Sequence, residues 1–408
     1  MKTPFAIVFH PLGYIIVLWI IYFLSLFENP LGWGASYGVR MLDYSHLYII
    51  YTVSFLAGGG LTYFVNKKLH RNTELVLTNP VSLRIKLILI IALLFFVARF
   101  IHIKDIPLLG DPFSRYRSNL GGFPDYPTRL LAPLGALSFL FYKKYRKAPY
   151  LKFFVFSIGL MILYTWRQEA LSIIIGVIML LALHYEFSVR RLIRFGITGF
   201  LFFFVMIGLL GIVRFGDHGL DGLGELYGLA MGFLHGEITT SQKFGAYVLE
   251  ELNGDYLGGI YTLGIFKSLF VLDFDAHGAE YLRQNFSSAF TAQSVGVPFG
   301  YVIDFGIIGL IFMGFIVGYM TYFLYRSYIN QQGFLSVLIF ITYYLQLMFS
   351  LRSGGLPFSP VFIYITLGLM FIFFNEIRGR LFSEFVPIII LGYLGTLLLS
   401  LIFLIIRI

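Results

Sequence analysis

Long apolar runs separated by short polar connections dominate this chain of 408 residues. A helix that crosses the hydrocarbon core of a bilayer needs about 20 apolar residues, with roughly 17 to 25 tolerated. By that criterion we expect about eleven spans, several of them short. They lie at 11–27, 47–65, 86–101, 130–142, 151–166, 170–187, 195–213, 299–325, 334–350, 358–374 and 384–406. The run at 130–142 is the weakest, because Pro133 and Gly135 interrupt it.

Composition makes lipid the main solvent of these runs. Hydrophobic residues form 58% of the chain and charged residues only 12%, about half the charged fraction of an ordinary soluble domain. A soluble core of this size would lack the polar residues needed to cover its surface. We therefore predict an all-α, polytopic integral membrane protein with about 11 transmembrane helices, in the range of roughly 10 to 12.

The net charge of +9 does not indicate a nucleic-acid partner. The basic residues of the chain fall in short clusters between apolar runs and do not line one soluble face, so they report the membrane topology. Because the chain contains no cysteine, disulfides, thiolate nucleophiles and cysteine-ligated metals are excluded. Any chemistry must come from other side chains.

Lysine and arginine concentrate in alternate connections, and cytoplasmic loops carry such an excess. This places the N-terminus in the cytoplasm and two longer segments outside, at 102–129 and 214–299. No A-x-A-type cleavage site follows the first run, so we expect it to be an uncleaved span. The chain then divides into an N-terminal membrane bundle at 1–213, a large outward-facing loop at 214–299 and C-terminal membrane helices at 300–408.

The large loop should be folded, since it is neither rich in Ser and Pro nor highly charged. Phe244, Tyr247, Val248 and Leu252 recur at helical spacing, which predicts a short amphipathic helix at the membrane interface. The apolar stretch at 260–272 is too short to span and is expected to be re-entrant or to lie on the surface.

Arginines recur at the outer ends of the expected spans. Arg167 caps an outer hairpin, Arg214 follows the seventh span, and Arg352 lies in Leu351-Arg352-Ser353-Gly354-Gly355. A guanidinium binds phosphate oxygens bidentately and stays charged at a membrane boundary, so converging arginines suit a pyrophosphate. Arg115 and Arg117, in the first outer segment, are further candidates. The alternative is that each arginine only anchors a helix to lipid headgroups.

Candidate proton acceptors occur in and after the large loop. Glycosyl transfer needs a carboxylate or imidazole to take a proton from the attacking hydroxyl, and Glu237, Asp304 and His277 are the candidates. The alternative for Glu237 and Asp304 is that each is a solvated loop acid or a helix N-terminal acid. The sequence Asp273-Phe274-Asp275 resembles a metal-binding D-x-D pair, but no nucleotide-binding domain accompanies it, so we expect no metal.

Taken in order along the chain, these features resemble the Wzy family of O-antigen and capsule repeat-unit polymerases. The likeness covers most of the chain and rests on order more than on any single motif. Its elements are Arg115 and Arg117, Trp166-Arg167-Gln168, the large loop from Arg214, Asp304-Phe305-Gly306-Ile307-Ile308-Gly309, and Leu351-Arg352-Ser353-Gly354-Gly355.

This resemblance implies a GT-C-like membrane glycosyltransferase of the bacterial cytoplasmic membrane, with its active site facing the periplasm or exterior. It would move a glycan from undecaprenyl pyrophosphate onto the next lipid-linked repeat unit, without metal or cofactor. Membrane lipid, a flippase and a chain-length regulator are the other implied partners, with no nucleic acid.

Other functions remain open at this point. In the related O-antigen ligases a histidine of the large loop precedes a G-x-x-G helix start, whereas Thr291, Gln293 and Ser294 stand here, which argues against ligase activity. A flippase or transporter should carry more ionisable residues inside its spans than this chain does. A non-enzymatic sensor would bind a lipid-linked repeat unit without converting it.

Overall fold

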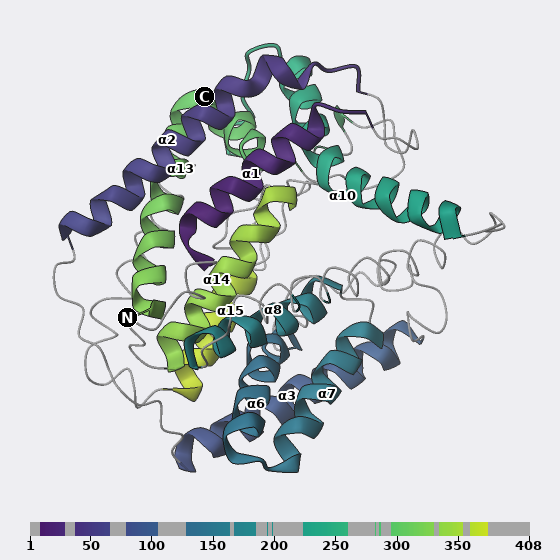
Figure 1. Cartoon of the computed structure of the whole chain (residues 1–408), viewed down its shortest axis with the longest axis vertical. Coiled ribbons are helices and arrows are strands. Elements are labelled where there is room, and N and C mark those ends of the chain that lie inside the picture. The colour runs from purple at the N-terminus through teal and green to yellow at the C-terminus, as the bar shows by residue number, and fades with distance from the viewer. Residues whose placement is uncertain are drawn as a thin grey trace.

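The computed structural model describes residues 9–28, 37–65, 79–104, 128–163, 167–184, 194, 198, 223–259, 282, 285–286, 295–329, 334–353 and 360–373. Within these ranges every regular element is a helix, which confirms the all-α prediction (Figure 1). In chain order the helices are α1 (Pro11–Ser25), η2 (Met41–Tyr44), α2 (Ser45–Val65), α3 (Asn79–Ile103), α6 (Leu131–Tyr145), α7 (Ala148–Leu163), α8 (Arg167–His184), α10 (Leu223–Leu252), α13 (Phe299–Ile329), α14 (Phe334–Ser353) and α15 (Pro360–Ile372).

Four helices of the described part are long and apolar enough to cross a bilayer: Met41–Phe64, Arg84–Ile103, Phe299–Ile329 and Phe334–Arg352. The outward-facing surfaces of α1, α2, α3 and α13 are also apolar, which a water-soluble bundle would avoid. Large hydrophobic side chains point outward at Ile16, Ile20, Phe23, Ile49, Val53, Phe64, Ile90, Leu94, Ile101, Ile307, Ile308 and Ile311. Together these features indicate a membrane protein.

The helices form two groups that meet on α14 (Figure 1). One group packs α2 against α13 and holds α1 and α10, and the other contains α3, α6, α7 and α8. Helix α14 contacts α1, α10 and α13 on one side and α6, α8 and α15 on the other. Its central place explains why most of its side chains are buried.

Glycines allow α2 and α13 to cross in close contact. A Cβ atom at Gly58 would overlap the backbone carbonyl of Phe315, and one at Gly318 would overlap the carbonyl of Phe55. The two backbones therefore approach each other reciprocally, as small residues permit between membrane helices. A larger side chain at either glycine would force the helices apart.

The turn between α6 and α7 has a left-handed cap. Arg146 has φ 56° and its amide donates to the Tyr142 carbonyl at 2.8 Å, which ends α6 in the αL manner. Pro133 is the third residue of α6, where its missing N–H breaks no helical hydrogen bond. The proline that weakened the sequence prediction at 130–142 is therefore compatible with a helix.

The expected runs that fall in the described ranges all coincide with helices. Most of 195–213 and all of 384–406 lie outside those ranges, as does 260–272. The helix expected around Phe244 is confirmed, but α10 is much longer and spans 30 residues. The run at 299–325 is also not one uniform helix, because Gly306 breaks it with φ 64° and ψ −164°.

Candidate functional site

A small pocket lies where the first turns of α6 and α8 meet the C-terminal half of α14 and the middle of α15. Its volume of about 50 Å³ has room for a few waters or one group of similar size. The lining residues are Arg129, Ala132, Pro133, Glu169, Ser172, Ile341, Thr342, Leu345, Gln346, Phe349 and Ile365.

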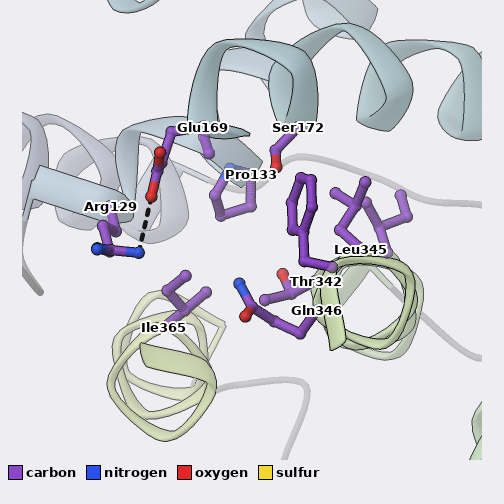
Figure 2. Close-up of a pocket in the computed structure, with 11 residues that line it drawn as sticks. Arg129, Pro133, Glu169, Ser172, Thr342, Leu345, Gln346 and Ile365 are labelled. Atoms are coloured by element: carbon purple, nitrogen blue, oxygen red, sulfur yellow. Dashed lines mark ion pairs between the residues drawn. The ribbon is translucent and has the colours of Figure 1, made fainter. Parts of the chain in front are cut away.

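An ion pair forms one wall of this pocket. Arg129 precedes α6 and Glu169 belongs to the first turn of α8, so the α6–α8 contact brings them together. Arg129 Nη1 lies 2.7 Å from Glu169 Oε1, with the side chains 24% and 11% exposed (Figure 2). Removing either partner would leave the other charge unpaired and poorly solvated, which would lower the stability of the fold.

Hydroxyl and amide groups complete the polar lining. Figure 2 shows Ser172 reaching into the pocket from α8, and Thr342 and Gln346 facing it from α14. The Thr342 hydroxyl donates to the Leu338 carbonyl at 2.8 Å, which leaves its oxygen able to accept from a ligand. The pocket thus offers both donors and acceptors beside apolar surface.

The same end of the bundle carries two of the predicted arginines. Arg167 is the first residue of α8, two positions before Glu169. Arg352 lies on α14, three positions after Phe349, and its side chain is exposed. The main chains of both arginines are therefore within one helical turn of the pocket. The side chain of Arg167 lies outside the described part.

Helix α10 contacts the same end of α14 through Gln242. This fully buried amide accepts a hydrogen bond from the Tyr48 hydroxyl at 2.8 Å and donates to the Leu351 carbonyl at 2.7 Å. One side chain thus joins α10, α2 and the residue before Arg352. The helix of the predicted outer loop is thereby fixed to the helix end that carries a predicted site arginine.

A second contact fastens α10 to the C-terminal end of α1. His235 Nε2 lies 3.1 Å from the Leu24 carbonyl and Lys243 Nζ donates to the Phe27 carbonyl at 2.9 Å. Since a carbonyl only accepts, His235 must carry its proton on Nε2. Partial burial lowers the pKa of both His235 and Lys243, because desolvation disfavours their charged forms.

The break in α13 lies next to Asp304. With the helix interrupted at Gly306, the carbonyls of Ile303 and Asp304 instead accept from the amides of Leu257 and Gly258, at 2.9 and 3.0 Å. The turn after α10 thus supplies hydrogen-bond donors to the two carbonyls that lose their helical partners at the break. Asp304 has no exposed surface and does not line the pocket, so a direct role as proton acceptor would require a conformational change.

The other predicted site residues are not positioned by the described part of the chain. The main chain of Glu237 belongs to α10, but its side chain lies outside the described part, and His277, Arg115, Arg117 and Arg214 lie wholly outside it. Among the described residues, no three His, Asp or Glu side chains come close enough to form a metal site. The roles of these residues stay predictions.

Sequence reasoning did not select Arg129, Glu169 or Gln346. The first two are charged residues at the border of apolar runs, which is a usable signal, but their pairing depends on how α6 packs against α8. Gln346 is a polar residue inside an apolar run, where a side chain of this type usually faces other protein groups. Its position in the predicted span 334–350 could have identified it.

Comparisons of the chain with protein-family models, with curated proteins and with solved structures gave no match.

Proposed function

We propose that this protein is a membrane glycosyltransferase that joins undecaprenyl-pyrophosphate-linked oligosaccharide repeat units into a surface polysaccharide, such as O-antigen or capsule. The observation that carries the proposal is a polar pocket bordered by Arg129, with the main chains of Arg167 and Arg352 within one helical turn, in a bundle whose outer faces are apolar. Such a site suits a substrate with a lipid tail, a pyrophosphate and sugars.

The proposed chemistry is displacement at the anomeric carbon of the donor. A sugar hydroxyl of the acceptor attacks this carbon, the bond to the pyrophosphate oxygen breaks, and the proton of the hydroxyl passes to a base. Arg167, Arg214 and Arg352 would bind the departing pyrophosphate, with Arg115 and Arg117 as additional contacts. Stabilising a leaving group of this charge is the largest catalytic contribution expected.

The proposal includes a topology. About eleven spans in a GT-C-like arrangement would place the N-terminus in the cytoplasm of a bacterium and the pocket toward the periplasm or exterior. The basic cluster from Lys143 to Lys147, at the opposite end of α6 from Arg129, supports this orientation. A flippase would deliver the substrate and a chain-length regulator would act on the product.

The test uses a bacterium that lacks its own polymerase. We expect Arg167→Ala, Arg214→Ala and Arg352→Ala each to leave single repeat units in place of long chains, while the unmodified protein restores a ladder. Arg40→Ala is the matched control, because Arg40 is exposed and lies outside the pocket lining. Normal ladders from all three variants would refute the proposed role of the arginines.

A further inference from the structure

The ion pair makes the pocket nearly neutral. Arg129 and Glu169 lie in direct contact and both are largely withdrawn from water, so their opposite charges cancel locally. A phosphate group that approached Arg129 here would also meet the Glu169 carboxylate. The pocket therefore favours a neutral ligand over an anion, and this separates it from the arginines proposed to bind pyrophosphate.

The remaining lining groups match the surface of a sugar. Sugar hydroxyls both donate and accept hydrogen bonds. Ser172 and Gln346 carry both donor and acceptor groups, and the Thr342 oxygen can accept. The Glu169 carboxylate adds an acceptor and the Arg129 guanidinium a donor. Between these polar groups lie apolar side chains that can cover the C–H face of a ring: Pro133, Leu345, Phe349 and Ile365.

We infer that this pocket binds hydroxyl groups of a neutral sugar residue through Glu169, Gln346 and Ser172. The inference rests on the proposed function, because it assigns this pocket to the glycan part of the lipid-linked substrate. Its volume of about 50 Å³ admits one edge of a single ring and not an oligosaccharide. The rest of the glycan would then lie beyond the ends of α6 and α8.

Direct binding to the full-length protein in detergent micelles tests this inference. The probes are the methyl glycosides of glucose, galactose, N-acetylglucosamine and rhamnose, with inorganic pyrophosphate as the competing anion. Saturation-transfer NMR gives a dissociation constant for each probe. We expect at least one glycoside to bind, and Glu169→Gln and Gln346→Leu each to weaken that binding about tenfold, as loss of one good hydrogen bond does.

A matched pair of serine variants controls for misfolding. Ser172→Ala should weaken glycoside binding, whereas Ser138→Ala should not, because Ser138 lies on α6 outside the lining and donates to the Leu134 carbonyl. If Glu169→Gln does not fold, Ser172→Ala and Gln346→Leu still decide the question.

Two outcomes would overturn the inference. One is that no glycoside of the set binds. The other is that the pocket variants leave glycoside binding unchanged. The proposed function is tested separately by the polymer ladder. If Arg352→Ala abolishes the ladder while Gln346→Leu leaves glycoside binding unchanged, the sugar-pocket inference is wrong and the proposed polymerase activity still stands.

Discussion

Gly306 shows how one residue shapes the region around Asp304. Its φ of 64° and ψ of −164° belong to a region that is open essentially to glycine alone. A Cβ at this position would also lie 2.7 Å from the ring of Tyr256. We predict that Gly306→Ala lowers the free energy of unfolding by about 1–3 kcal/mol, measured by thermal unfolding in detergent. Tyr256→Ala should restore part of the loss, and full stability of the single variant would contradict the prediction.

The buried amide of Gln242 holds two hydrogen-bond partners in the core. Gln242→Leu leaves the Tyr48 hydroxyl and the Leu351 carbonyl without their partner, and each such buried group costs about 1–3 kcal/mol. Tyr48→Phe removes one of the two bonds and should cost less. Because the residues share a hydrogen bond, the double variant should be more stable than the sum of the single effects predicts. Strict additivity would argue against this coupling.

The close crossing of α2 and α13 can be tested with two glycine variants of α2. Gly58→Ala places a Cβ on the Phe315 carbonyl, whereas Gly60→Ala on the same helix faces open space. Overpacking against backbone should cost Gly58→Ala about 3 kcal/mol or more, and Gly60→Ala should gain up to about 1 kcal/mol in helix propensity. Yields of folded protein and melting temperatures measure both. Equal behaviour of the two variants would mean that the helices do not cross in this way.

The contact between α10 and α1 should depend on pH. In the folded state, burial and the nearby charge of Lys243 lower the pKa of His235. The charge of Glu28 opposes the lowering of the Lys243 pKa by burial. The unfolded state therefore takes up a proton more readily, so stability is lost as the pH falls below about 6.5. Between pH 7.5 and 5.5 the melting temperature should fall more for the natural protein than for His235→Gln. An identical pH dependence would contradict this.

Helix positions could be predicted from the sequence to the extent that apolar length determines them. The runs from 11–27 to 358–374 that fall in the described part are helices, because a continuous apolar run in lipid must satisfy its own backbone. The first half of α10 was missed, since Gly224, Gly228 and Gly232 lower its helix propensity and its packing on other helices is not visible in the sequence. The pocket was missed for the same reason, because Arg129 and Glu169 meet only through the contact between α6 and α8.

The whole molecule is predicted to have one orientation, and the absence of cysteine makes this simple to test. Lys147 and Asp255 are both exposed, and each can be replaced by a single cysteine without removing others. A membrane-impermeant maleimide should label Asp255→Cys in intact spheroplasts and Lys147→Cys only after lysis. The reverse pattern would invert the topology and move the pocket to the cytoplasmic side.

The proposed enzyme combines an apolar bundle, an arginine-bordered pocket and the helix α10 packed against α14. The most direct measurement incubates the purified full-length protein with undecaprenyl-pyrophosphate-linked repeat units, without nucleotide sugar or added metal. We expect a ladder of polymers with release of undecaprenyl pyrophosphate, and no ladder from Arg352→Ala. Substrate that binds to the natural protein but stays as single repeat units would contradict the proposed polymerase activity.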